Sequence, residues 1–138
     1  MSSKYPRFDP EMDPIWREKL TNIQYNVTRE GGTERPFTGN LYLENRNGEY
    51  YCICCENLLF SSSMKFNSNC GWPSFHSEHP DAKIIRLEDK SHGMTRIELR
   101  CGECDAHLGH IFDDGPRNLG GMRYCINSAS MKFTAMGD

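Results

Sequence analysis

Four of the seven cysteines in this chain of 138 residues fall into two closely spaced pairs. Cys52 and Cys55 form one CxxC pair, and Cys101 and Cys104 form a second. Each pair follows a run of residues that is predicted to be a strand, and Gly102 permits a tight turn within the second pair. Four thiolates in a tetrahedral arrangement make a closed structural zinc site, with no open position for a substrate. The spacing therefore predicts one Zn²⁺ ion held by all four cysteines.

Two other interpretations of these pairs are open. Buried cysteines can act as small hydrophobic residues, but two CxxC pairs would seldom arise by accident. A redox-active CxxC is the other possibility, although it would explain one pair and leave the second without a role. Cys54 lies between Cys52 and Cys55, and we expect its side chain to point away from the metal as an incidental thiol.

A further cysteine, Cys125, has polar neighbours that suit a reactive thiolate. If residues 123–127 form a strand, its period of two places Arg123, Cys125 and Asn127 on one face. The positive charge of Arg123 stabilises a thiolate, which is the nucleophilic form of cysteine. The alternative is a structural cysteine packed in the core, but a core face would carry apolar neighbours. The pattern therefore favours a nucleophilic Cys125.

Two histidines and an acid precede this cysteine in the run from His107 to Asp114. The period of a strand places His110, Phe112 and Asp114 on one face, and a bend at Gly109 could let His107 join them. Histidines, an acid and a nearby thiol are the groups that thiol-based acid–base chemistry needs. They could also be metal ligands, although the four paired cysteines already saturate one zinc ion.

The segment from Cys70 to Phe75 has the composition of a loop, with a glycine, a proline and two aromatic residues. Trp72 and Phe75 could simply fill the core. In the functional interpretation they form an apolar wall beside the thiol of Cys70, suited to a small group that carries a methyl.

The elements that would carry these residues are mostly short strands. Gly and Pro occur throughout the chain, and short runs of alternating or apolar residues separate them. In residues 95–100 the alternation predicts one buried face and one wet face, and Asn47-Gly48 predicts a two-residue hairpin turn. Strands are predicted at residues 41–43, 50–52, 84–87, 95–99, 107–112, 123–127 and 131–134. The fold class is therefore all-β, as a compact arrangement of two small antiparallel sheets.

Two short helices are predicted before the strands, after a loose lead-in at residues 1–12. The first spans residues 13–20, with Asp13 as its N-cap and Pro14 at the first helical position.

The second helix is predicted to run to about Thr28. Thr21 is its N-cap, Gln24 completes a capping box, and Gly31-Gly32 ends it.

Composition and charge exclude several function classes. Sixteen basic and 19 acidic residues give a net charge of −3, and no basic cluster forms a phosphate-binding stripe, which argues against nucleic acid as a partner. No apolar run approaches the roughly 20 residues needed to cross a bilayer, and the N-terminus lacks the apolar core of a secretory signal. An odd number of cysteines suits metal binding and reactive thiols in a reducing compartment. We therefore expect a single domain, residues 1–138, that acts in the cytoplasm, with a nuclear share also open.

Taken together, these motifs resemble those of the type B methionine sulfoxide reductases, which act on methionine-R-sulfoxide. The matching stretches follow the order of that family and cover most of the chain: Gly32–Gly39, both CxxC pairs, Cys70–Phe75, Ser91–Met94, His107–Pro116 and Arg123–Ser130.

The resemblance implies a role for each candidate residue. Cys125 would attack the sulfoxide sulfur, and a protonated His110, helped by His107, would protonate the departing oxygen. Cys70 would then resolve the sulfenic acid on Cys125 as a disulfide, which thioredoxin would reduce. The resemblance further implies that the pocket is shaped by Trp72, His107, His110, Phe112 and Asp114. It implies that the reactivity of Cys125 is tuned by Arg123 and Asn127.

The resemblance also implies a monomer that repairs oxidised proteins, with its zinc opposite the active site. This chain departs from some relatives, which carry selenocysteine where Cys125 stands here, and Cys54 is not expected at its position. Two rival functions stay open, a zinc-binding adaptor without catalysis and a different zinc-scaffold enzyme that handles thiol adducts.

Overall fold

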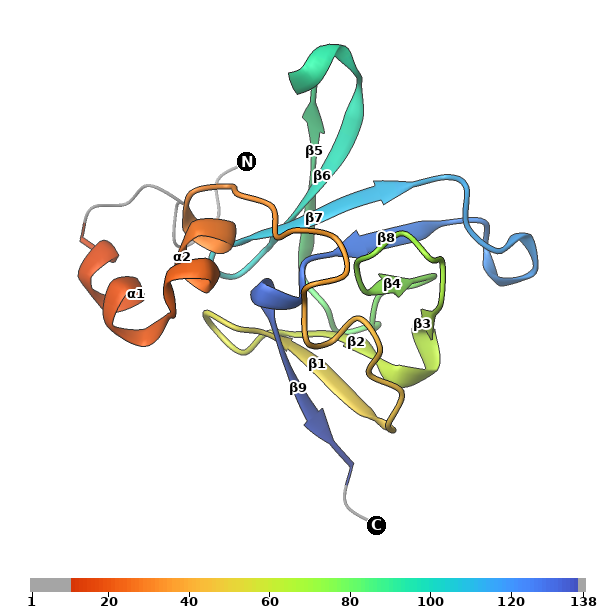
Figure 1. The fold of residues 1–138 in the computed structure, drawn as a ribbon, viewed down its shortest axis with the longest axis horizontal. Helices are drawn as coiled ribbons and strands as arrows, with labels where there is room; N and C mark the ends of the chain where they lie inside the picture. Colours follow the sequence, from red (N-terminus) through yellow and green to blue (C-terminus); the bar gives the residue numbers. More distant parts are fainter. Residues whose placement is uncertain (1–10, 137–138) are drawn as a thin grey trace.

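The computed structural model describes residues 11–136, in which two short helices precede two antiparallel sheets (Figure 1). The three-stranded sheet has the order β2-β1-β9, and the six-stranded sheet has the order β3-β4-β8-β7-β6-β5. The prediction of an all-β fold with short N-terminal helices is therefore confirmed. The helices and strands are α1 (Asp13–Lys19), α2 (Asn22–Arg29), β1 (Gly48–Cys52), β2 (Leu58–Ser61), β3 (Lys65–Phe66), β4 (Ser74–Phe75), β5 (Ile84–Asp89), β6 (Arg96–Cys101), β7 (His107–Phe112), β8 (Arg123–Ile126) and β9 (Met131–Ala135).

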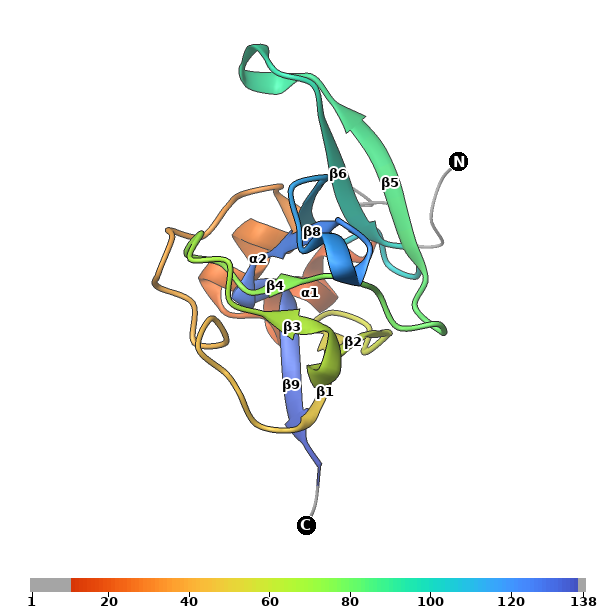
Figure 2. The same ribbon diagram turned by 90° about the vertical axis from the view of Figure 1, so that its right-hand side faces the viewer.

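Single turns of 3-10 helix complete the described chain. They are η1 (Ser62–Met64), η2 (Ser91–Gly93), η3 (Arg117–Leu119) and η4 (Ser128–Ser130). The hairpin of β5 and β6 extends beyond the rest of the molecule in both views (Figures 1 and 2). Neither α1 nor α2, the α-helices of the described chain, is long and apolar enough to cross a membrane.

The two helices differ from each other in how well the sequence predicted them. The capping box of α2 is confirmed, because the Thr21 hydroxyl accepts from the Gln24 amide and the Gln24 side chain accepts from the Thr21 amide. The prediction that Asp13 is the N-cap of α1 is wrong by one residue. Met12 holds that position, and the Asp13 carboxylate instead accepts from Arg17 at 2.6 Å and from Tyr25. The part of the predicted lead-in before residue 11 lies outside the described residues.

The predicted hairpin around Asn47-Gly48 does not form, because residues 41–43 make a turn and not a strand. Both edges of β1 are already paired, one with β2 and the other with β9, so no edge is left for residues 41–43. The Asn47 carbonyl accepts from the Met136 amide at 2.9 Å, which extends the pairing of β1 with β9. The other predicted strands are found, with β5 two residues longer than expected.

The prediction that one face of β6 is exposed to solvent is wrong. Arg96, Glu98 and Arg100 are only partly exposed, because β5 and β7 flank β6. The residues paired with them, which lie on the same face, are Ile85, Leu87 and Asp89 in β5 and His107 and His110 in β7. That face forms one side of the candidate site described below.

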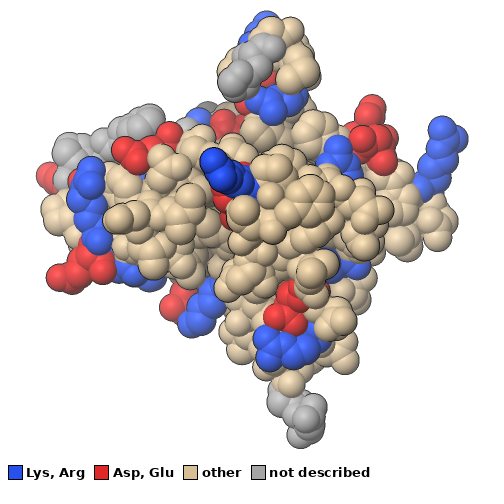
Figure 3. Space-filling view, viewed as in Figure 1, with Lys and Arg blue, Asp and Glu red and all other residues tan. Residues whose placement is uncertain are grey.

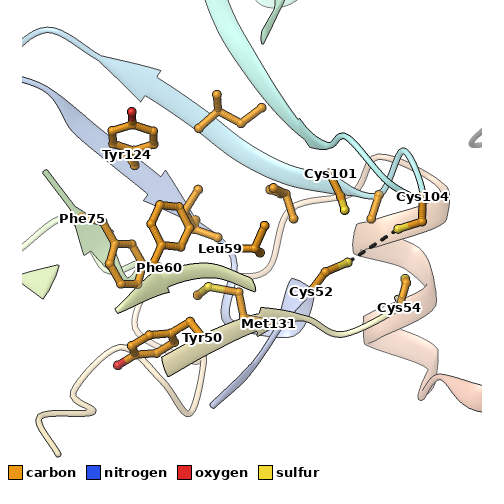
Figure 4. Close-up of a cluster of buried hydrophobic side chains, with 14 of the residues drawn as sticks. Tyr50, Cys52, Cys54, Leu59, Phe60, Phe75, Cys101, Cys104, Tyr124 and Met131 are labelled. Carbon is orange, nitrogen blue, oxygen red and sulfur yellow. Dashed lines mark hydrogen bonds between the residues drawn. The ribbon is translucent and has the colours of Figure 1, made fainter. Parts of the chain in front are cut away.

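The core between the sheets combines aliphatic side chains and cysteines with a group of aromatic rings (Figure 4). Phe60 stacks on Phe75 with ring centroids 4.1 Å apart, and Tyr50 and Tyr124 meet this pair edge-on. Phe75 is fully buried, so of its two interpretations the core one holds. Basic and acidic side chains are interspersed over the outer face shown in Figure 3.

Removing the Phe60 ring should therefore destabilise the protein strongly. We expect Phe60→Ala to lower the free energy of unfolding by about 3–5 kcal/mol, because the ring leaves a cavity between the two sheets. Leu43→Ala is the control, since the Leu43 side chain is 77% exposed and its loss should change stability by no more than about 0.5 kcal/mol. Urea unfolding of the metal-loaded protein measures both, and equal losses would contradict the assignment of the core.

Candidate active site

Two cysteines that are far apart in the sequence meet at the end of the larger sheet. Cys125 lies in β8, Cys70 lies in the loop before β4, and their sulfurs are 3.6 Å apart. The Cys70 sulfur is also 3.4 Å from the Ser74 hydroxyl, and Ser74 pairs directly with Cys125 across β4 and β8. The loop turns at Gly71, whose φ of 95° lies in the left-handed region that favours glycine.

A pocket of about 300 Å³ opens over this thiol pair. Trp72 and Phe112 supply apolar wall, while His110, Arg123 and Asn127 supply polar groups. The lining residues are Thr33, Cys70, Trp72, Arg96, Gly109, His110, Phe112, Arg123, Cys125 and Asn127. This combination of a methyl-sized apolar surface and several hydrogen-bond donors beside two thiols is what a small polar, methyl-bearing group would require.

Strand register places the acid–base candidates beside the thiols. His110 in β7 pairs directly with Cys125 on one side and with Glu98 in β6 on the other. Phe112 likewise pairs with Arg123, whose guanidinium lies 4.5 Å from the Phe112 ring centroid. Directly paired residues project from the same face of a sheet, so two adjacent rows of side chains form the floor of the pocket.

The two histidines share a face because β7 contains a bulge. Leu99 pairs with Gly109 and Arg100 pairs with His107, which leaves Leu108 unpaired and restores His107 to the face of His110. The two imidazole rings lie 5.7 Å apart, with His107 buried behind His110. The sequence predicted a bend at Gly109, but Gly109 serves close packing instead. A Cβ there would lie 2.0 Å from the Cys125 carbonyl oxygen.

Two carboxylates that the sequence analysis missed hold the histidines. His107 Nδ1 lies 2.7 Å from Glu98 Oε2, and His110 Nε2 lies 2.8 Å from Asp89 Oδ2. Burial lowers the pKa of His110, and the positive charge of Arg96 lowers it further, while the hydrogen bond to Asp89 opposes the shift. Hydrogen bonds from Ser91 and then from His110 lower the pKa of Asp89, so Asp89 is ionised at neutral pH.

Asn127 and Glu34 connect the pocket to the rest of the chain. The Asn127 side chain donates to the Leu108 carbonyl at 3.0 Å and accepts from the Glu34 amide at 3.0 Å. The Trp72 indole N–H donates to the Glu34 carbonyl at 3.0 Å. The buried Glu34 carboxylate accepts from two amides of the segment that follows Asn127. Nothing in the local pattern around Glu34 signalled this role.

Asp114 lies outside the pocket, on the far side of Arg123. Its carboxylate accepts from Arg123 Nε at 2.8 Å and from Nη2 at 3.2 Å, and most of its side chain is exposed. The structure thus brings together nearly all of the predicted site residues, with His107 behind the pocket and Asp114 beside it. Their catalytic roles stay predictions.

The two thiols titrate as a pair. The hydrogen bond from the Cys125 thiol lowers the pKa of Cys70 to about 4, against the opposing effect of burial. The same bond, followed by burial, raises the pKa of Cys125, while Arg123 lowers it. At neutral pH the pair therefore holds one proton and one negative charge between its two sulfurs.

The four paired cysteines form a second cluster. Three of them, Cys52, Cys101 and Cys104, are labelled in Figure 4 at the opposite end of the core from Tyr50. The four sulfurs all lie within 4.8 Å of one another, with Cys52 and Cys104 3.6 Å apart and Cys55 and Cys101 3.5 Å apart. A tetrahedral site with zinc–sulfur bonds of about 2.3 Å needs sulfurs about 3.8 Å apart. The donor set and its spacing fit a metal ion, and none of these cysteines lines the pocket.

Two matching turns present these cysteines, one from each sheet. After β1, the Cys52 amide donates to the Asn57 carbonyl, and after β6 the Cys101 amide donates to the Ala106 carbonyl. Glu56 and Asp105 occupy the same position in the two turns, with positive φ of 66° and 65°. The cluster therefore joins the two sheets.

Cys54 is buried in the same turn as Cys52 and Cys55. Its sulfur is not among the four that lie within 4.8 Å of one another, so the expectation that Cys54 is not a metal ligand stays a prediction.

Comparisons with known proteins give a consistent result. The SelR domain family model matches residues 20–135. Three relatives are each called peptide methionine sulfoxide reductase MsrB: one from Chromohalobacter salexigens is 50% identical over 96% of this chain and 97% of its own length, one from Hahella chejuensis is 54% identical over 91% of both, and one from Cellvibrio japonicus is 54% identical over 86% of this chain and 84% of its own.

A more distant likeness concerns the fold alone. The crystal structure of the Mis18 'Yippee-like' domain matches with a TM-score of 0.52 at 14% identity, covering 67% of this chain and all of that domain.

The cysteine cluster leads to a prediction about metal content. We expect Cys101→Ser to reduce bound zinc from one per chain to a small fraction and to lower the melting temperature, because one of four ligands is lost. Cys54→Ser is the matched control, since it removes a buried thiol from the same region, and it should keep the full metal content. Elemental analysis and thermal melts measure both, and zinc loss from the Cys54 variant alone would contradict the ligand set.

The thiol pair leads to a prediction about pH. Because the hydrogen bond with Cys70 is the largest cause that raises the pKa of Cys125, Cys70→Ser should lower the pKa of Cys125. Adding Arg123→Met in that background should raise it again, since the positive charge is lost. The pH dependence of Cys125 alkylation, followed by mass mapping, measures these shifts. An unchanged or higher Cys125 pKa in the Cys70 variant would show that the two thiols do not titrate together.

Proposed function

This chain belongs to the MsrB family of methionine sulfoxide reductases, and we propose that it reduces the R epimer of methionine sulfoxide in oxidised proteins. The observation that carries this proposal is the pair of sulfurs 3.6 Å apart in a pocket where His110 pairs directly with Cys125. A nucleophilic thiol, a resolving thiol and a proton donor are the groups that sulfoxide reduction requires.

In the proposed reaction Cys70 takes the proton of the Cys125 thiol, and the Cys125 thiolate attacks the sulfoxide sulfur while one proton reaches the sulfoxide oxygen. The S–O bond of the sulfoxide and the new bond between the two sulfurs then break as the hydroxyl group moves to Cys125, so methionine leaves and Cys125 becomes a sulfenic acid. The Cys70 thiol then attacks that sulfur, water departs, and a disulfide forms. Arg123 supports the first step because its charge favours the thiolate on Cys125.

His110 is the proposed proton donor, with His107 behind it. Asp89 occupies Nε2 of His110, which leaves Nδ1 for the substrate oxygen. Burial lowers the pKa of His110, so its protonated form gives up a proton readily. Glu98 holds His107 in the same way, and we assign Asp89 and Glu98 as positioning residues for the two imidazoles.

The epimer preference follows from the opposed surfaces of the pocket. Trp72 and Phe112 suit the methyl group, while His110 and Asn127 suit the oxygen. With the sulfur held over Cys125, only one arrangement of methyl and oxygen satisfies both surfaces. The Trp72 ring is fixed for this task by its bond to the Glu34 carbonyl.

The proposal also covers the reductant, the metal ion and the cellular compartment of the enzyme. Thioredoxin, a dithiol reductant, reduces the Cys70–Cys125 disulfide and returns both thiols. A structural zinc ion is held by Cys52, Cys55, Cys101 and Cys104 and supplies no chemistry in the pocket. We propose that the protein acts as a monomer, and the need for free thiols supports a reducing compartment such as the cytoplasm.

The proposal predicts different defects for the two thiols. The parent protein should reduce the R epimer of a methionine sulfoxide peptide and leave the S epimer largely unchanged. Cys125→Ser should abolish the reaction, since a hydroxyl is too weakly ionised to replace the thiolate. Cys70→Ser should release about one methionine per enzyme in a single turnover and then fail to recycle with thioredoxin.

Cys54→Ser is the control for thiol number and should behave as the parent in both assays. Single-turnover and thioredoxin-coupled assays, with separate epimers, measure these outcomes. Equal rates on both epimers would sink the stereochemical assignment. Full thioredoxin recycling by Cys70→Ser would overturn its resolving role.

A further inference from the structure

A buried arginine lies against the cysteine cluster and takes no part in the pocket. Arg29 is the last residue of α2 and is 1% exposed. Its Nη2 donates to the Cys104 carbonyl at 2.7 Å, and its Nη1 lies 3.7 Å from the Cys104 sulfur. Its guanidinium is 4.7 Å from the ring centroid of Trp16 in α1.

Burying this guanidinium has a cost that the surrounding protein only partly offsets. Its Nε has no hydrogen-bond partner. No other arginine or lysine among residues 11–136 is buried to this degree. A charge in such a place needs an opposite charge beside it.

The cysteine cluster carries that opposite charge. Four thiolates around one divalent cation leave two net negative charges. Two lysines also lie near the cluster: Lys83 pairs with Glu103 at 2.8 Å, and Lys19, which is exposed to solvent, donates to the main-chain carbonyl of Cys54 and not to a sulfur. The Asn57 amide donates to the Cys101 sulfur at 3.4 Å but carries no charge.

We propose that Arg29 is the positioning residue that holds the metal in this cluster, as its buried counter-cation and as a hydrogen-bond donor to Cys104. The proposal rests on the zinc site of the proposed function. A thiolate that accepts a hydrogen bond from a fixed cation is less readily protonated and stays on the metal. Metal binding and the docking of α2 therefore stabilise each other.

The same contact supports the substrate pocket from a distance. Arg29 ends α2, and the chain then runs directly to Thr33 in the pocket wall and to Glu34, which holds Trp72 and Asn127. α2 also packs against β7 and η4. A helix anchored to the metal cluster through Arg29 thus fixes the start of the segment on which the Trp72 wall depends.

The test compares zinc release from the full, zinc-loaded chain. We expect Arg29→Met to transfer zinc to a chromophoric chelator about 10- to 100-fold faster than the parent. Arg29→Lys keeps the charge and should fall between the two. Arg17→Met is the matched control, because Arg17 stacks on Tyr25 and pairs with Asp13 in the same helical region without touching a cysteine. It should release zinc at the parental rate.

A spectroscopic readout separates this role from simple destabilisation. In the cobalt-substituted protein, losing the N–H···S bond in Arg29→Met should move the sulfur-to-cobalt charge-transfer band to longer wavelength, and Arg17→Met should leave it in place. If Arg29→Met does not fold, the lysine variant decides, through its release rate and its band position.

Parental release rates and an unshifted band in the Arg29 variants would overturn the proposal. Equal acceleration by Arg17→Met, or a lysine variant no better than the methionine one, would overturn the counter-cation role. A parent protein that yields no zinc to the chelator even after it is denatured would instead refute the proposed zinc site itself, so the two failures are distinct.

Discussion

Both sheets depend on one contact, which joins the two turns that carry the paired cysteines. The turn after β1 belongs to the three-stranded sheet and the turn after β6 to the six-stranded sheet, and their four sulfurs lie within 4.8 Å of one another. A chain of this size buries a limited apolar core, here centred on the stacked rings of Phe60 and Phe75. A metal ion held by these four sulfurs would cross-link the two sheets and add stability at the end of the core that the aromatic rings do not reach.

The strand register of the larger sheet, which begins at the cysteine cluster, also determines where the two thiols of the pocket lie. β7 starts just after the Cys101–Cys104 turn, and its pairing with β8 sets His110 opposite Cys125. The two backbones approach so closely that only a glycine fits at position 109. The β5–β6 hairpin then supplies Asp89 and Glu98 to the histidines. The site is thus a property of strand register, and loops contribute mainly Cys70 and Trp72.

The sequence predicted what short spacings determine. Both CxxC pairs, the capping box at Thr21 and the alternation around Cys125 involve residues a few positions apart, and each appears in the structure. Partnerships across the sheets carry no local signal. Glu34 meets Asn127 across more than half of the chain, and the polar face of β6 looked like a solvent face because its partners in β7 could not be seen. Residues 41–43 failed as a strand for the same reason, since β9 had taken the edge of β1.

Because β7 contains a bulge at Leu108, replacing a residue of this strand and deleting one have different structural consequences. The Leu108 main-chain carbonyl accepts from the Asn127 amide and side chain, so another apolar residue could replace Leu108 without disturbing this contact. Regular pairing over the same number of residues would turn His107 to the opposite face of the sheet, whereas loss of the bulged residue would leave the two histidines two positions apart on one face of a regular strand. During evolution this stretch can therefore exchange side chains freely, but it can lose the bulge only together with one residue. A relative whose two histidines stand two positions apart would need no bulge to bring one imidazole behind the other.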